Sequence, residues 1–326
     1  MHTVKWLAFA AGIALAVGLI GWTGVGEVTR ATAAIGWGFA WIVLFRATPI
    51  LLTALAWRAL LGGADERAPF GDLMLLRWIG DAVNGLLPTA QVAGELVRAR
   101  LLARRAGLRL VTAAASVAAD QLAGLLTLAL FVAGGVAIIA WLKPTDELRW
   151  SLGAAVLVLL LLAGGMIVAL RVGAGGRLAA LVDRRLLADE ELSLSRAMAG
   201  FEQVTQAIIA SGSAFVGGCL WRLLAWVSGA VEVWLAAMLI GTPVSWLAAL
   251  AIEAVVQAAR AIGFAVPGAV GLQEGAFLLA GTALGLPLEA ALALALVKRG
   301  REIATGLPGL FVWPFVERRA APAPGA

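Results

Sequence analysis

Ionisable and amide side chains interrupt the apolar stretches in the C-terminal half of this chain. Glu253, Gln257 and Arg260 follow at intervals of four and three residues, which places them on one face of a helix. Further candidate binding residues of this half are Pro267, Gln273, Glu274, Lys298, Arg299 and Glu302. A charge inside a membrane costs about 2.5–3.5 kcal/mol on insertion scales, so such residues are candidates for a function.

The N-terminal half carries a similar polar group around its own Pro/Gly break. Pro88 is followed seven residues later by Glu95, as Pro267 is followed seven residues later by Glu274. Small residues fill both intervals, so the two segments are candidates for an internal repeat. The candidate binding residues of the first segment are Asn84, Pro88, Gln91, Glu95, Arg98 and Arg100. We expect Arg98 and Arg100 to emerge at the cytoplasmic interface, where guanidinium groups can hold a phosphate.

The opposite signs of these charges favour ion pairs, such as Glu253 or Glu274 with Arg260 or Arg299. Two interpretations follow, and both can hold at once. The pairs could be structural and hold broken helices together, or they could line a hydrophilic cavity for a lipid headgroup or a proton.

No other group of residues in the sequence points to a catalytic or metal-binding site. The chain has one Cys and one His, Cys219 and His2, which argues against a metal site built from these residue types. Walker A, H-E-x-x-H and G-x-S-x-G motifs are absent from the sequence. We therefore expect no catalytic residue, no metal, no cofactor, no enzymatic activity and no nucleic-acid partner.

The elements that must position these residues are membrane-spanning helices. Hydrophobic residues make up 62% of the 326 residues, charged residues 14%, and the mean hydropathy is +0.94. This composition excludes a soluble or disordered chain and predicts an all-α polytopic integral membrane protein. About six transmembrane helices are expected, at 4–23, 33–61, 111–142, 150–171, 213–240 and 288–316. We interpret the first as a retained helix rather than a signal peptide. Tryptophans near the span ends suggest an interfacial belt: Trp6, Trp22, Trp37, Trp57, Trp141, Trp150, Trp246 and Trp313.

Two stretches, 71–98 and 247–286, are too polar and broken for simple spans, and we expect two re-entrant helical hairpins there. Halves of about 1–142 and 150–317 would then each hold three spans and one hairpin. An odd number of spans inverts the second half, so the expected arrangement is an inverted repeat within a single membrane domain, 1–317. The tail, 318–326, is expected to be disordered.

Basic residues orient the chain. The proposed external loops hold only Arg30, Lys143 and Arg149, whereas the opposite side carries runs such as Arg98 to Arg109. The positive-inside rule then places both termini in the cytoplasm of a bacterium, in a multi-pass cytoplasmic (inner) membrane protein. Residues 174–211 read as an amphipathic cytoplasmic connector, with a lipid or partner surface as the alternative.

Two motifs carry a family resemblance. The segment from Asn84 to Arg100, NGLLPTAQVAGELVRAR, and the segment from Val266 to Gly275, VPGAVGLQEG, resemble the two signatures of the lysylphosphatidylglycerol synthase transmembrane (flippase-like) superfamily. The details look most like its hopanoid biosynthesis-associated membrane proteins. The resemblance implies a role in moving a lipid across or between membranes. The soluble catalytic domain of the aminoacyl-lipid synthases has no counterpart in this sequence, so aminoacyl transfer is not expected.

The leading expectation is therefore transport or flipping of a lipid, a hopanoid or an anionic or polar-headed lipid, through a cavity between the two hairpins. Its partners would be membrane lipids, either hopanoid or phospholipid. The alternative is a non-transporting membrane partner or scaffold that recruits hopanoid biosynthesis or transport proteins through 174–211. An enzyme acting on a headgroup through Glu95 or Glu274 is the weakest alternative, since no nucleophile or metal set accompanies them.

Overall fold

The computed structural model describes residues 35–61, 68–87, 93–142, 146–174, 177, 194–263, 269 and 271–319. Within these ranges the chain is helical and contains no strand. The helices are α3 (Gly38–Phe45), α4 (Ala47–Leu61), α5 (Phe70–Leu86), α6 (Ala93–Ala106), α7 (Leu110–Leu142), α8 (Asp146–Arg171), α10 (Leu194–Ala210), α11 (Ser213–Ile240), α12 (Trp246–Ile262), α13 (Leu272–Ala283) and α14 (Leu288–Arg319).

Three segments in this part of the chain are long and apolar enough to cross a membrane. They are Gly38–Leu61, which comprises α3 and α4, and the single helices α7 and α11. Helix α14 is continuous over 32 residues, but Lys298, Arg299, Arg301 and Glu302 interrupt its apolar sequence. Helix α8 has a shorter apolar part, Val156–Arg171. The described part of the chain is thus all helical and contains helices that suit a membrane protein, as expected. The proposed first span, 4–23, and the tail from 320 lie outside the described residues.

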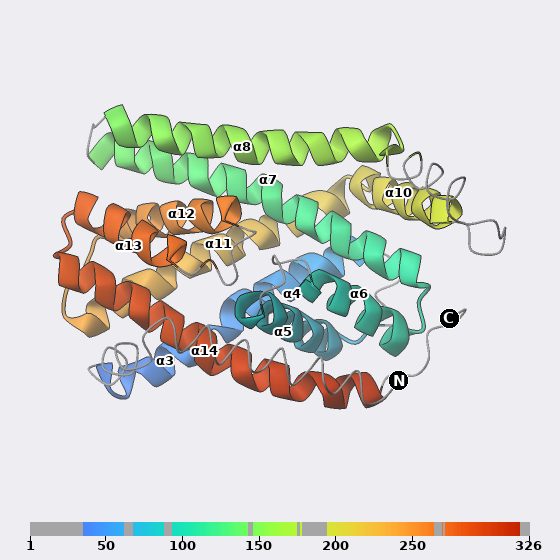
Figure 1. The fold of residues 1–326 in the computed structure, drawn as a ribbon, viewed down its shortest axis with the longest axis horizontal. Helices are drawn as coiled ribbons and strands as arrows, with labels where there is room; N and C mark the ends of the chain where they lie inside the picture. The colour runs from blue at the N-terminus through green and yellow to red at the C-terminus, as the bar shows by residue number, and fades with distance from the viewer. Residues whose placement is uncertain are drawn as a thin grey trace.

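Each polar stretch forms a pair of short helices that pack against each other. Helix α5 packs on α6, and α12 packs on α13. In Figure 1 the two pairs lie between the long α7–α8 pair along one edge of the molecule and α14 along the other. Helices α4 and α11 pack closely against each other, and this contact joins the two halves of the chain.

Small residues allow the closest helix approaches, as is usual for helices that pack within membranes. A Cβ atom on Gly94 of α6 would lie 2.3 Å from the carbonyl oxygen of Gly80 in α5. A Cβ atom on Gly135 of α7 would lie 2.3 Å from the Cβ of Ala254 in α12. The α5–α6 and α7–α12 crossings therefore depend on glycine.

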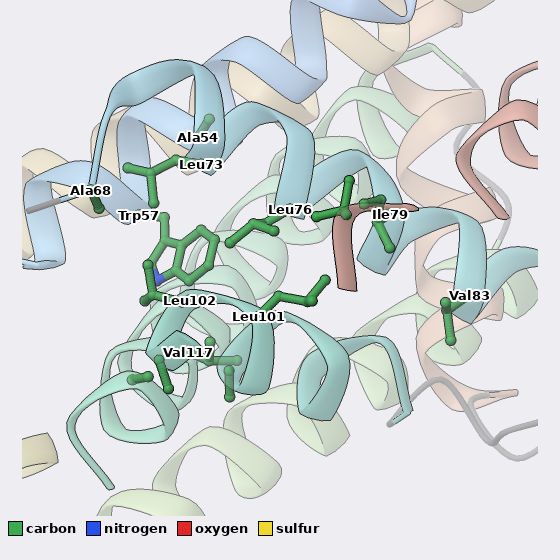
Figure 2. Close-up of a cluster of buried hydrophobic side chains, with 14 of the residues drawn as sticks. Ala54, Trp57, Ala68, Leu73, Leu76, Ile79, Val83, Leu101, Leu102 and Val117 are labelled. Atoms are coloured by element: carbon green, nitrogen blue, oxygen red, sulfur yellow. The ribbon is translucent and has the colours of Figure 1, made fainter. Parts of the chain in front are cut away.

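Apolar side chains form two main cores and also cover much of the surface. One core surrounds the first helix pair and includes Trp57, Leu76 and Leu101 (Figure 2). The second joins α12 and α13 to α11 and α14. Large apolar side chains point outward, with Trp37 90% and Trp141 84% exposed, as expected for a surface that contacts lipid.

Of the tryptophans expected in the belt, Trp37, Trp141 and Trp246 are exposed, whereas Trp57 is not, so the expectation is wrong for Trp57. Trp57 is fully buried, and its indole N–H donates to the Ser116 hydroxyl at 3.1 Å. Its position near the end of α4 suggested an interfacial residue, but the first helix pair folds over it. Local position along a helix does not reveal such coverage.

Helix α10 is the described part of the proposed connector. It packs against α7 and α8, with Thr205 and Glu202 buried, and the Gln206 amide donates to the Leu170 carbonyl. These contacts attach α10 to the membrane domain and favour its interpretation as a structural connector.

Candidate functional site

A cavity of about 540 Å³ lies between the two helix pairs. Its walls come from α4, α5, α6, α7, α8, α11, α12 and α14, and most of the polar residues singled out from the sequence face it. The part of its wall formed by Leu125, Leu128, Leu162 and Trp226 is apolar. A cavity of this size can hold several waters or a ligand headgroup.

Three arginines converge on one carboxylate beside this cavity. Asp120 of α7 is fully buried and accepts hydrogen bonds from Arg77 Nη1 at 2.7 Å, Arg98 Nη2 at 2.8 Å and Arg222 Nη2 at 2.8 Å. Arg222 Nε also donates to the other Asp120 oxygen at 2.9 Å. These four residues, Arg77, Arg98, Asp120 and Arg222, are called the Asp120 cluster. They join α5, α6, α7 and α11.

The tip of the first helix pair is tied together by polar contacts. Asn84 accepts a hydrogen bond from the Gly94 backbone N–H at 2.8 Å, and its amide donates to Glu95 at 3.2 Å. Glu95 in turn accepts from Arg98 at 2.5 Å. The Arg98 guanidinium lies over the Trp57 ring, 4.2 Å from its centroid, and the side chain is fully buried. The expectation that Arg98 emerges at the interface is therefore wrong.

A second set of ion pairs holds the other helix pair to α14. Arg299 pairs with Glu274 at 2.8 Å and with Glu302 at 3.0 Å, while Arg260 pairs with Glu302 at 2.6 Å. Arg260 also donates to Gln273. The expected Glu274–Arg299 pair is present. Arg260, Glu274, Arg299 and Glu302 are called the Glu302 cluster.

Three further ion pairs connect other helices at the cavity. Arg46, between α3 and α4, pairs with Asp81 of α5 at 2.8 Å. Arg301 of α14 pairs with Glu232 of α11 at 2.9 Å. Glu253 of α12 pairs with Lys298 of α14 and also accepts from the Gln257 amide at 2.6 Å.

Protein groups already cap the first turns of α6 and α13. The Gly271 N–H donates to the Glu274 carboxylate at 2.8 Å, and the Gly94 N–H donates to Asn84. Gly271 has a φ of +81°, which glycine tolerates and other L-residues rarely adopt. The positive ends of these helix dipoles are therefore partly neutralised by the protein itself.

The structure brings most of the expected binding residues together. Those that line the cavity are Asn84, Glu95, Glu253, Gln257, Arg260, Lys298 and Glu302. Arg98, Arg299, Gln273 and Glu274 lie behind them and hold them in place. Arg100 is elsewhere, about half exposed and paired with Glu317 at 2.7 Å. Pro88, Gln91 and Pro267 lie outside the described residues.

Several residues that line or support the cavity were not among the expected binding residues. They are Arg46, Arg77, Asp81, Asp120, Arg222, Glu232 and Arg301. Each is a charged residue inside an apolar segment, which is the one signal that the sequence offers for it. Asp120 and Arg222 are 102 positions apart, so only the folded chain shows that they pair.

The charged side chains that line or support the cavity carry one more positive than negative charge. The acidic members are Asp81, Glu95, Asp120, Glu232, Glu253, Glu274 and Glu302, and the basic members are Arg46, Arg77, Arg98, Arg222, Arg260, Lys298, Arg299 and Arg301. The excess arises around the Asp120 cluster, where Asp120 pairs with three arginines, Glu95 pairs with one of them, and Asp81 is shared between Arg77 and Arg46. An uncompensated charge away from water is costly and attracts a counter-ion.

The described residues contain no group of His, Cys, Asp and Glu side chains that could hold a metal ion. The fold and the cavity define a helical membrane domain that encloses a charged, net-basic cavity between two pairs of short helices. A model of the family described as the lysylphosphatidylglycerol synthase TM region matches residues 9–309, so the chain belongs to this family. Neither the curated proteins nor the solved structures include a significant match. Family membership links the chain to a membrane lipid-related function and agrees with the resemblance found in its two motifs.

Proposed function

We propose that this protein moves a lipid across the membrane, with the lipid headgroup passing through the cavity between the two helix pairs. The observation that carries this proposal is the cavity itself, which is charged, net basic and bordered by an apolar wall. A polar headgroup can lie against the charged side chains while the acyl chains remain against apolar surface. The net positive charge favours an anionic headgroup, such as a phosphodiester.

Arg46, Arg77 and Arg222 are the side chains best placed to meet such a headgroup. All three line the cavity. Arginine binds phosphate oxygens through a planar fork of N–H donors, and the observed ion pairs of these residues use only part of their donors.

An inverted repeat with two re-entrant hairpins is part of this proposal. Helix α7 packs on α12 as α14 packs on α5, and α4 packs on α5 as α11 packs on α12. Asp120 follows Glu95 by 25 positions, and Arg299 follows Glu274 by 25 positions. At these matched positions, the first half has the acid Asp120 and the second half has the base Arg299. Inverted repeats whose broken helices meet at a central site are a transporter architecture.

The assignments of domain boundaries, membrane topology, location and substrate are also part of this proposal. They are a single membrane domain over 1–317, both termini in the cytoplasm, multi-pass insertion in a bacterial inner membrane, and a hopanoid or phospholipid substrate. An enzymatic role is not part of the proposal. The scaffold alternative would gain support if the wild-type protein bound lipid enzymes but moved no lipid.

Reconstitution in liposomes tests the proposal. Vesicles contain fluorescent phosphatidylglycerol in both leaflets, and dithionite quenches only the outer-leaflet dye. Wild-type protein should bring the inner-leaflet dye outward, so quenching exceeds half. Arg46→Gln and Arg77→Gln should slow this movement at least about tenfold, since each removes a phosphate ligand worth about 1.4 kcal/mol or more.

Arg58→Gln is the matched control. Arg58 is also an arginine of the same membrane-spanning segment as Arg46, but it is exposed, does not line the cavity and lies over the Phe70 ring. The control should move lipid at the wild-type rate. Equal rates in all four proteins would overturn the assignment of the cavity, and no movement by the wild type would overturn the proposed function.

A further inference from the structure

A second hollow lies apart from the central cavity, between α4, α10 and the start of α11. It has a volume of about 490 Å³ and is bounded by residues that include Leu61, Arg109, Val204, Ile208 and Ala214. We call it the α10 groove. None of the residues that line it also lines the central cavity, so it is a separate site.

Three membrane-crossing segments end at the α10 groove. The segment Gly38–Leu61 ends there, α11 begins there one residue before Ala214, and α7 begins directly after Arg109. Each of the three is long and apolar enough to cross a membrane. The ends of spanning segments lie at the level of the lipid headgroups, so the groove faces the boundary between hydrocarbon and headgroups.

Most of the groove lining is apolar. Leu60 of α4 lies against α11, where a Cβ on Gly218 would be 2.9 Å from its side chain. Val204 and Ile208 are four residues apart and therefore share one face of α10, and both line the groove. An apolar hollow at this depth is better filled by a hydrocarbon chain than by water.

Arg109 adds a positive charge to this apolar site. Its side chain is exposed and lines the groove. The nearby Arg105 is neutralised by Asp72 at 2.6 Å, whereas Arg109 has no acidic partner in the part of the chain that the structure describes. The exposed residues Gln203 and Ser211 bring further polar groups to the same groove. A guanidinium beside an apolar groove complements an anionic headgroup whose hydrocarbon chain enters the groove.

We propose that the α10 groove binds one anionic phospholipid as a resident ligand, with its phosphate against Arg109 and a hydrocarbon chain against Leu60, Val204 and Ile208. This lipid is distinct from the one that passes through the central cavity, and the site goes beyond the proposed lipid movement. It contacts α10 together with α4 and α11, whose packing joins the two halves of the chain. The resident lipid therefore ties α10 to the contact between the halves.

Fluorescence quenching at the groove tests the proposal. In a Cys219→Ser background, bimane is attached at Gln203→Cys, an exposed position of the groove, and the full-length protein is placed in nanodiscs. A small fraction of the nanodisc lipid carries a nitroxide on one acyl chain and has either a phosphatidylglycerol or a phosphatidylcholine headgroup. The phosphatidylglycerol probe should quench at about fivefold lower fraction, because one basic residue at the membrane surface favours an anionic lipid by about this factor.

Variants separate the headgroup contact from the chain contact. Arg109→Gln should abolish the preference for phosphatidylglycerol, and Arg109→Lys should keep most of it. Arg171→Gln is the matched control and should keep the preference, since Arg171 is an exposed arginine at the end of α8 that does not line the groove. Ala207→Phe, on the exposed surface of α10, should fill the groove and reduce quenching by both probes.

Equal quenching by the two probes in the unaltered groove would overturn the site. Survival of the preference in Arg109→Gln, or its loss in Arg171→Gln, would do the same, because either result would assign the effect to general surface charge. Absence of quenching by both probes would assign the groove to another occupant, such as a second copy of the chain. Relief of quenching by added glycerol 1-phosphate would show a site for soluble phosphates instead of a lipid. The assay measures no lipid movement, so its outcome is independent of the proposed function.

Discussion

At the scale of single residues, the charges inside this protein are held in networks rather than in isolated pairs. Asp120 binds three arginines from three helices and is fully buried. A buried ion pair contributes little net stability compared with apolar packing, but removal of one partner leaves the other charge without compensation. Asp120 is therefore the residue whose loss would leave the most buried charge unpaired.

We expect Asp120→Asn to destabilise the protein by at least about 3–5 kcal/mol, because three buried guanidinium groups would lose their common carboxylate. Thermal unfolding in detergent, followed by intrinsic tryptophan fluorescence, measures the effect. Asp72→Asn is the matched control, since Asp72 binds Arg105 at 2.6 Å where both side chains are about a quarter exposed. The control should cost no more than about 1 kcal/mol. Similar losses for both variants would contradict the role assigned to Asp120.

At the scale of elements, close helix crossings decide where the polar side chains lie. Gly135 of α7 faces Ala254 of α12, one position after the buried Glu253. This contact brings α12 close to α7 and sets how deeply Glu253 and Gln257 reach into the cavity. The first pair has a comparable crossing, where Gly94 lies against Gly80 and places Glu95 beside Asn84.

Adjacent glycines in α7 allow a matched test of this packing. A methyl group at Gly135 would lie 2.3 Å from the Ala254 Cβ, whereas one at Gly134 would meet no atom within 4 Å. Gly135→Ala should therefore lower stability by about 1–3 kcal/mol and slow lipid movement, because α12 must shift. Gly134→Ala should leave both unchanged or raise stability slightly, since alanine favours helix. The same unfolding and liposome assays measure both variants, and equal effects would rule out this crossing as a constraint.

At the scale of the whole molecule, the two halves share packing partners and spacing but not charge. The Asp120 cluster centres on an acid and the Glu302 cluster on an arginine–glutamate pair, and α4 and α11 join the halves between them. This difference supplies the excess positive charge on which the headgroup site depends. A perfectly symmetric repeat would not concentrate charge in this way.

The proposed inversion predicts which side of the membrane each helix pair opens to. In a Cys219→Ser background, Gly71→Cys should lie on the cytoplasmic side at the start of α5, and Leu288→Cys should lie on the outer side at the start of α14. Both positions are exposed, and a Cβ at Gly71 meets no neighbour. A membrane-impermeant maleimide added to spheroplasts should label Leu288→Cys at once and Gly71→Cys only after permeabilisation. Labelling of both before permeabilisation would contradict the inversion.

Composition and local pattern were sufficient for the broad architecture. The apolar runs predicted helices and a membrane location, and the Pro/Gly breaks after Asn84 and before Gly271 predicted two pairs of short helices. These features depend on neighbours within a few turns, which a linear pattern records directly. Glu95 and Glu274 were recognised as polar members of the two breaks for the same reason.

Only the tertiary structure decided which charges meet and which surface each side chain faces. Arg98 is buried beneath Trp57, while Arg100, two positions later, is on the outside with Glu317. Asp120, Arg77 and Arg222 come together from distant parts of the chain. Such contacts depend on how helices cross, and crossings depend on the fit of whole helix faces at positions such as Gly94 and Gly135. No local pattern of residues encodes that fit, so the net charge of the cavity became visible only in the folded chain.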